Sequence, residues 1–217
     1  AKYNNKFSIK IFLCFYLTFL LWNIIATSWL YYASLGGVLF AVLVNSFLMT
    51  MVFSLFFIVS KKINSKLSLI FLVSFWLCFE KFHLMWDFSW PWLNIGNVFS
   101  EKTEWIQWYE YTGSFGGTLW VLLTNILIYK VFLSTIYNEK PRLLIVSLIL
   151  VIIVPITISK IILYNLDLEE EPIDVFIIQP NIDPYSEKYT RTDKDNYHYV
   201  HDLLEENSIK NSTIILP

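Results

Sequence analysis

Two histidines near the carboxyl end of the chain have a spacing that could bind a metal ion. His198 and His201 are three residues apart, so on a helix they would share one face, with Asp195 and Asp202 beside them. A catalytic zinc needs three protein ligands and supporting hydrogen bonds, and the sequence shows neither the third ligand nor that support. We therefore interpret the pair as part of a solvated helix face and expect no metal and no cofactor.

Cysteines are the next candidates for chemistry, as nucleophiles. Cys14 and Cys78 both fall inside long apolar runs, where a cysteine is most often a small packing residue. Without a CxxC pattern, the sequence indicates neither a zinc knuckle nor a disulfide framework. We expect no catalytic residue within this chain.

Tryptophans form the densest chemical cluster. Five of the nine lie between residues 80 and 113, namely Trp86, Trp90, Trp92, Trp105 and Trp108. Pro91 breaks a helix, and Gly96 and Asn97 permit a turn, so we expect a loop lined with aromatic rings. Rings at a membrane surface serve either as an anchoring belt or as the walls of a lipid site, and both alternatives stay open.

The elements that would position these residues are mostly membrane spans. Of the 217 residues, 56% are hydrophobic and 16% are charged, whereas soluble domains have about 25% charged residues. No Asp, Glu, Lys, Arg or His occurs from residue 11 to residue 60, and a spanning helix needs about 20 mostly apolar residues. We expect a transmembrane domain over residues 1–165 with five spans, at about 8–30, 37–59, 67–84, 114–133 and 142–163.

Charge indicates orientation and excludes some functions. Basic residues cluster before the first span and in alternate loops, which marks those loops as cytoplasmic: Lys2, Lys6 and Lys10, then Lys61, Lys62 and Lys66, then Lys130, Lys140 and Arg142. The tail from Tyr164 onward would then lie outside. No expected span has an ionisable residue near its centre, which disfavours a pump or secondary transporter. The net charge of −2 gives no electrostatic case for nucleic-acid binding.

Three asparagines, Asn23, Asn45 and Asn125, fall in the middle of the expected spans. We expect them to form hydrogen bonds between helices.

The tail has the pattern of a β-α-β unit. Residues 173–179 are almost continuously apolar, as in a strand covered on both faces, and residues 213–216 predict a second strand. Between them, Thr192 and Asp195 have the spacing of a capping box at the start of a helix. This order favours a parallel pair. Reactive groups in such sheets lie beyond the carboxyl ends of strands, so we expect the catalytic chemistry after Pro217 and expect a fragment at both ends.

Four groups of residues, in matching order, give the chain a resemblance to the apolipoprotein N-acyltransferase family. They are Trp29-Leu30-Tyr31 before Gly36-Gly37; Trp76-x3-Glu80 and Phe82 before Trp90-Pro91-Trp92-Leu93-x2-Gly96-Asn97; Gly113-x2-Gly116 leading to Asn125; and Val175-x3-Gln179-Pro180-Asn181-Ile182 followed by Lys188-Tyr189 and Ile214-Ile215-Leu216-Pro217. The chain departs from the family pattern at Trp90, where Phe is usual, and at Tyr189 and Leu216, where Trp is usual.

The resemblance implies a fold class: a polytopic α-helical membrane domain followed by the start of an α/β nitrilase-like domain, an α-β-β-α sandwich, here residues 170–217. It implies two spans before Ala1, and after Pro217 a glutamate, the rest of the domain and a final span. It places the protein in the bacterial inner membrane with its soluble domain in the periplasm.

The implied reaction is the last step of lipoprotein maturation. A Glu-Lys-Cys site beyond residue 217 would take an acyl chain from a membrane phospholipid as a thioester and pass it to the N-terminal amine of a diacylated apolipoprotein. Glu would act as the general base and Lys would stabilise the oxyanion.

Four residues of this chain become candidate substrate contacts through the resemblance. Tyr189 is the first, because its family counterpart lies in a loop by the active site, although it could be an ordinary loop tyrosine. Trp90 and Trp92 would form walls of an acyl pocket. Glu80 would orient the aromatic loop through hydrogen bonds, or could instead pair with Lys81 or Lys102.

Three alternatives stay open. One is a polytopic carrier or channel with an extracytoplasmic α/β domain, for which Pro155 in the last span is the one hint. Another is a non-enzymatic anchor for a partner-binding domain. A third keeps the nitrilase-like fold with a hydrolase reaction or another acyl acceptor. The sequence beyond Pro217 would separate them.

Overall fold

The computed structural model describes residues 7–166, 175–179, 181–183, 186–187, 190–206 and 213–215. The chain forms two compact units, residues 1–166 and residues 167–217.

The described residues of the first unit include five long helices: α1 (Ile9–Thr27), α2 (Leu35–Ser60), α3 (Ser65–Met85), α4 (Tyr109–Ile136) and α5 (Arg142–Tyr164). A 3-10 turn, η1 (Ser28–Tyr32), extends α1. Each helix is long and apolar enough to cross a membrane, so the described part of the unit is a polytopic helical domain.

Local sequence explains where the helices begin. The Ser34 hydroxyl accepts a hydrogen bond from the Gly37 N–H at 3.1 Å and caps α2. The Asn64 side chain accepts one from the Leu67 N–H at 2.9 Å and caps α3. The start of α4 lies five residues before the expected position 114, and its first turn contains a kink at Gly113, where φ is +64°.

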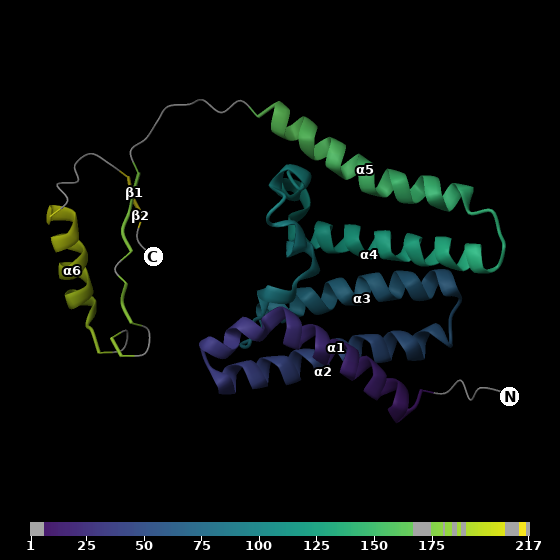
Figure 1. The fold of residues 1–217 in the computed structure, drawn as a ribbon, viewed down its shortest axis with the longest axis horizontal. Coiled ribbons are helices and arrows are strands. Elements are labelled where there is room, and N and C mark those ends of the chain that lie inside the picture. The colour runs from purple at the N-terminus through teal and green to yellow at the C-terminus, as the bar shows by residue number, and fades with distance from the viewer. Residues whose placement is uncertain are drawn as a thin grey trace. The chain divides into compact units, whose positions relative to one another are not determined.

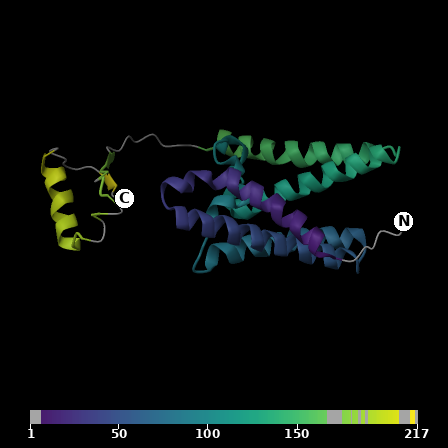
Figure 2. The same cartoon turned by 60° about the horizontal axis from the view of Figure 1, so that its bottom comes forward.

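Helices that follow one another in the chain pack against one another. Figure 1 shows α2 to α5 lying side by side in chain order, with α1 crossing α2 obliquely. Figures 1 and 2 both show α4 and α5 close together at their connecting turn and apart at the other end, where the segment between α3 and α4 lies.

The buried core of this unit joins α1, α2 and α3. It consists of Phe19, Met49, Val52, Trp76 and Phe79. Its rings meet mostly edge to face, as aromatic pairs prefer; the ring of Phe19, for example, lies 5.1 Å from that of Phe53.

The mid-span asparagines form fewer hydrogen bonds between helices than expected. Asn23 donates to its own helix, to the Phe19 carbonyl at 2.8 Å, and makes a longer contact of 3.6 Å with the Met49 sulfur across to α2. The Asn45 amide nitrogen is buried without a partner, and Asn125 is exposed on α4. The expectation was therefore wrong for Asn45 and Asn125. The amide of Asn23 shows the physical reason, because a short polar side chain on a helix reaches its own backbone carbonyl easily.

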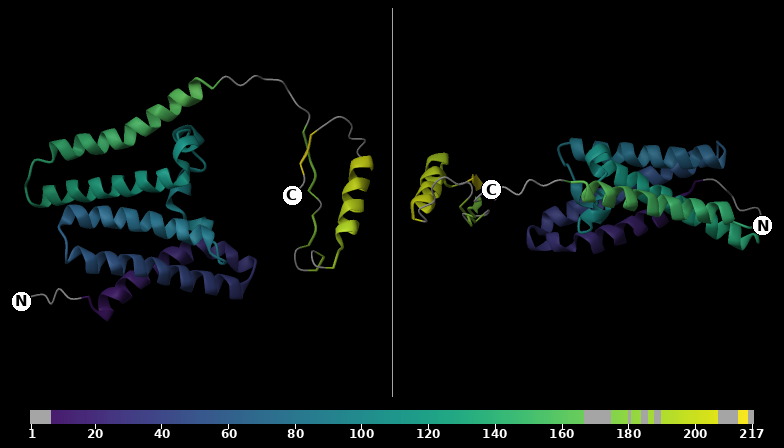
Figure 3. Two further views of the ribbon diagram at one scale, coloured as in Figure 1. Left: turned by 180° about the vertical axis from the view of Figure 1, so that it is seen from behind. Right: turned by 90° about the horizontal axis from the view of Figure 1, so that it is seen from above.

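The described residues of the second unit form two strands and a helix, which Figure 3 shows. Strands β1 (Val175–Ile177) and β2 (Thr213–Ile215) pair in parallel, with Val175 opposite Thr213, and α6 (Asp193–Glu206) lies between them in sequence. The expected parallel pair is confirmed. So is the capping box: Asp195 accepts from the Thr192 N–H at 3.0 Å, and the Asp195 N–H donates to the Thr192 hydroxyl at 3.2 Å.

The first strand is less covered than its apolar sequence predicts. Val175 and Ile177 are 47% and 74% exposed, and the following Ile178 is buried. The expectation of a strand covered on both faces is wrong for the described residues, because two strands alone offer each other no face-to-face layer. Residues 173, 174 and 216 of the expected strands lie outside the described residues.

Candidate lipid-binding site

The segment of residues 86–108, here named the aromatic loop, connects α3 to α4. It consists of three short 3-10 turns: η2 (Pro91–Leu93), η3 (Ile95–Phe99) and η4 (Thr103–Trp105). Pro91 begins η2, where its fixed φ suits the turn, and the Asn94 side chain accepts from the Gly96 N–H at 3.0 Å at the start of η3. The expected loop lined with rings is confirmed.

Glu80 near the end of α3 fastens the aromatic loop. Its side chain is only 4% exposed. One carboxylate oxygen accepts from the Trp76 indole at 3.0 Å and from the Ile95 N–H at 2.9 Å, and the other accepts from the Thr118 hydroxyl at 2.6 Å. All three donors are neutral, so a buried carboxylate links α3, η3 and α4 through hydrogen bonds rather than through a lysine. This confirms that Glu80 orients the loop; its contact with substrate stays a prediction.

Gly96 brings the loop backbone against α4. Its N–H donates to the Thr118 hydroxyl at 2.9 Å, and its carbonyl accepts from the Tyr109 hydroxyl at 2.8 Å. A Cβ at this position would overlap the Ser114 carbonyl, so the close approach requires glycine. The Gly96-Asn97 pair that predicted a turn therefore also sets the packing distance between the loop and α4.

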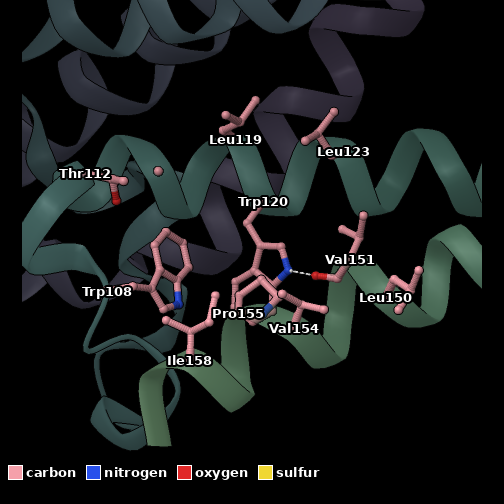
Figure 4. Close-up of a pocket in the computed structure, with 11 residues that line it drawn as sticks. Trp108, Thr112, Leu119, Trp120, Leu123, Leu150, Val151, Val154, Pro155 and Ile158 are labelled. Carbon is pink, nitrogen blue, oxygen red and sulfur yellow. Dashed lines mark hydrogen bonds between the residues drawn. The ribbon is translucent and has the colours of Figure 1, made fainter. Parts of the chain in front are cut away.

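An apolar groove of about 530 Å³ lies between α4 and α5 (Figure 4). It is lined by Trp108, Thr112, Gly116, Leu119, Trp120, Leu123, Leu150, Val151, Val154, Pro155 and Ile158. The Trp108 and Trp120 rings lie nearly perpendicular at 5.8 Å and form the wall of the groove nearest the aromatic loop.

Two polar contacts hold α5 beside this groove. Proline has no N–H, so Pro155 leaves the carbonyl four residues earlier, that of Val151, without its helical partner. The Trp120 indole donates to that carbonyl at 2.6 Å, as Figure 4 shows. Nearer the end of α5, the buried Ser159 hydroxyl accepts from the Gln107 N–H at 2.6 Å. Pro155 and Ser159 thus attach α5 to α4 and to the aromatic loop.

Three of the predicted site residues, Glu80, Trp90 and Trp92, do not line this groove. Trp90 is partly buried and borders a small cavity with Glu80 and His83. Trp92 is 59% exposed and meets Trp29 edge to face at 5.2 Å. Tyr189 lies outside the described residues.

Sequence reasoning missed the groove itself. Trp108 had been noted only as one ring of the loop, and Trp120 had not been singled out. The role of Trp120 depends on the Val151 carbonyl of α5, which Pro155 leaves without its helical partner, and no local pattern signals such a pairing. Pro155 is a hint of a transporter in the sequence, whereas in the structure it lines the groove.

His198, His201 and the two cysteines take no part in this site. Within the described ranges, no group of three or more His, Cys, Asp or Glu residues could hold a metal ion, and His201 lies 3.7 Å from Glu205 on the same helix. Cys14 and Cys78 are exposed on α1 and α3. The expectation that they are packing residues was wrong, because a small apolar side chain is equally suited to a lipid-facing position.

Comparison with known proteins gives two matches. Residues 2–127 match the family described as the apolipoprotein N-acyltransferase N-terminal domain. The chain is 25% identical over 172 residues to an apolipoprotein N-acyltransferase of Chlorobaculum tepidum, which covers 78% of this chain and 32% of that protein. The chain thus spans about a third of the length of the curated relative it matches. No solved structure matches the chain.

Proposed function

Because the chain belongs to the apolipoprotein N-acyltransferase family, we propose that the whole protein moves an acyl chain from a membrane phospholipid to the N-terminal amine of a diacylated apolipoprotein. The observation that carries this proposal is the family match over residues 2–127. The relative from Chlorobaculum tepidum bears the same name.

The proposed setting is the bacterial inner membrane. Residues 1–165 form its multi-pass domain, and residues 170–217 begin a periplasmic nitrilase-like domain. Basic residues in alternate loops support this orientation. The parallel β-α-β arrangement supports an α/β domain, and the exposed faces of Val175 and Ile177 are suited to being covered by further layers of a sandwich.

The proposed chemistry uses a Glu-Lys-Cys site beyond residue 217 and no cofactor. The cysteine thiolate attacks the carbonyl of the phospholipid ester, a thioester forms, and the lysophospholipid leaves after taking a proton from the general acid. The free amine of the apolipoprotein then attacks the thioester and gives a proton to the glutamate, an amide bond forms, and the thiolate is released. The lysine stabilises the oxyanion in both steps.

In this scheme, the part of the chain described here holds the lipid. The α4–α5 groove has the walls that an acyl chain needs, since apolar side chains line it along about 12 Å of helix, from Leu150 to Ile158. A groove between spanning helices also meets the acyl chains of the bilayer directly. Tyr189, Trp90, Trp92 and Glu80 remain proposed substrate contacts.

A product assay tests the proposal. Whole protein in detergent, given phospholipid and a synthetic diacylated lipopeptide, should yield a lipopeptide heavier by one acyl chain at its N-terminus, as measured by mass spectrometry. Trp92→Ala should lower this activity without lowering the yield of folded protein.

Other products would favour the alternatives. Fatty acid released without acylated peptide would indicate a hydrolase. If the folded protein forms neither acylated lipopeptide nor fatty acid, the result would indicate an anchor or a carrier. Lost expression of Trp92→Ala with normal activity per folded molecule would favour a plain aromatic belt.

A further inference from the structure

Three buried nitrogens at the end of α3 lack a hydrogen-bond partner. Among the described residues, they are His83 Nε2, Trp86 Nε1 and Trp90 Nε1, all within eight positions of one another. Buried polar atoms in folded proteins almost always have a partner, so a group of three such atoms needs an explanation. The function proposed above uses none of them in this way.

The residues around His83 border a small cavity. His83 is only 4% exposed, and its ring stacks on Phe79 at 5.1 Å and lies 5.5 Å from the Trp86 ring. The backbone N–H of Trp90 donates to the backbone carbonyl of His83 at 3.1 Å, which fixes the two residues beside each other. His83, Trp90 and Glu80 border one cavity of about 10 Å³.

The chemistry of these groups selects the ligand. An indole nitrogen can only donate a hydrogen bond, and a neutral histidine can donate from Nε2, so the partner must be an acceptor. The cavity volume corresponds to about one water-sized group, which admits a single oxygen atom. A whole phosphate group is larger than this cavity, so a single carbonyl oxygen is favoured over a phosphate.

We propose that His83 and Trp90, with Trp86 beside them, form a polar subsite for the ester carbonyl oxygen of a glycerolipid. This identification of the ligand rests on the proposed function. The location agrees with it, because tryptophans concentrate at the membrane–water interface, the depth at which the glycerol esters of lipids lie.

An ether analogue tests this subsite directly, because it keeps the headgroup and chains but lacks the carbonyl oxygen. We would measure the Kd of the whole protein in detergent for ester-linked and dialkyl ether phosphatidylglycerol of equal chain length. The wild type should bind the ester about fivefold tighter, the value of one ordinary hydrogen bond. Trp90→Phe and His83→Phe should remove this preference.

Trp29→Phe is the matched control. It makes the same ring exchange at the same end of the bundle, beside Trp92, and should keep the ester preference. Thermal unfolding of each variant identifies any that fails to fold. If His83→Phe fails to fold, the ester preference of Trp90→Phe, a change in the loop, decides the result.

Two outcomes would overturn the subsite. If Trp90→Phe keeps the full ester preference, or the wild type has none, the nitrogens bind water only. If glycerol 3-phosphate competes with both lipids equally, the site takes a phosphate group instead. Neither outcome touches the acyl-transfer proposal, which fails only if the wild type forms no acylated lipopeptide.

Discussion

Glu80 shows how one buried residue can set the geometry of a loop. A carboxylate has two oxygens and no proton to donate, so it can accept several hydrogen bonds at once without leaving a donor unpaired. At Glu80 the three donors come from α3, from the loop backbone and from α4. Glu80 therefore connects the loop to two helices at one point.

Replacing Glu80 with glutamine should destabilise the protein. The new amide nitrogen would face a donor, and one of the three donors would lose its acceptor inside the protein, which costs about 1–3 kcal/mol. The free energy of unfolding of the whole protein in detergent would measure this loss. Glu110→Gln, an exposed change on α4, is the matched control. Equal stability of the two variants would refute the anchoring role of Glu80.

Among the elements, α5 contains a backbone carbonyl whose hydrogen-bond partner is a side chain of another helix. Its proline would leave the Val151 carbonyl unpaired in a lipid environment, where no water can compensate. The Trp120 indole supplies the missing partner and at the same time forms a wall of the groove. The Val151 carbonyl therefore keeps a hydrogen-bond partner, although α4 and α5 lie apart at the end near the aromatic loop.

A double-mutant cycle tests the pairing. Trp120→Phe alone should lower stability by about 1 kcal/mol, because it leaves the Val151 carbonyl without a partner. Pro155→Ala restores a helical N–H for that carbonyl, so Trp120→Phe should cost clearly less in the Pro155→Ala background. The free energies of unfolding of the four proteins give the coupling. Additive effects would mean that the indole and the proline act independently.

The α6 capping box makes a small pH-dependent contribution. Hydrogen bonds from the Thr192 hydroxyl and N–H hold the pKa of Asp195 below its ordinary value. The stabilisation is therefore complete above the ordinary pKa of aspartate, about 4, and is lost as the pH falls through the lowered pKa of the folded state. Thr192→Ala should speed amide hydrogen exchange in the first turn of α6 at pH 7, and by a smaller factor at pH 3. An equal factor at both pH values would contradict this account.

Local pattern predicted most of the elements but little of the site. Charge-free runs located five long helices, and the spacing of Thr192 and Asp195 located the start of α6, because both signals depend on residues near in sequence. The groove depends on Trp120 reaching a carbonyl 31 residues away on α5. The same holds for Gly96, whose close approach to α4 is a property of two elements together and leaves no trace in either sequence segment alone.

For the whole molecule, the distribution of basic residues predicts the orientation. The loop after α2 contains Lys61 and Lys62, and the connection before α5 contains Lys140, so these ends should face the cytoplasm. The segment after α5 and the aromatic loop would then face the periplasm, where the proposed acceptor lies.

Reporter fusions measure this orientation. Alkaline phosphatase, which is active only outside the cytoplasm, should be active when fused after Leu166 and inactive when fused at Asn64. The opposite pattern would invert the topology and remove the periplasmic assignment of the second unit.

The central claim is that the α4–α5 groove holds the acyl chain that the enzyme transfers, and cross-linking in the whole protein tests it most directly. A phospholipid with a photoactivatable group in its acyl chain would be illuminated with the protein in membranes, and the labelled peptides identified by mass spectrometry. The account predicts labels on the segments around Trp108–Leu123 and Leu150–Ile158, and loss of these labels when an unlabelled ester phospholipid is in excess. Labels spread evenly over all five helices, unaffected by competitor, would contradict it.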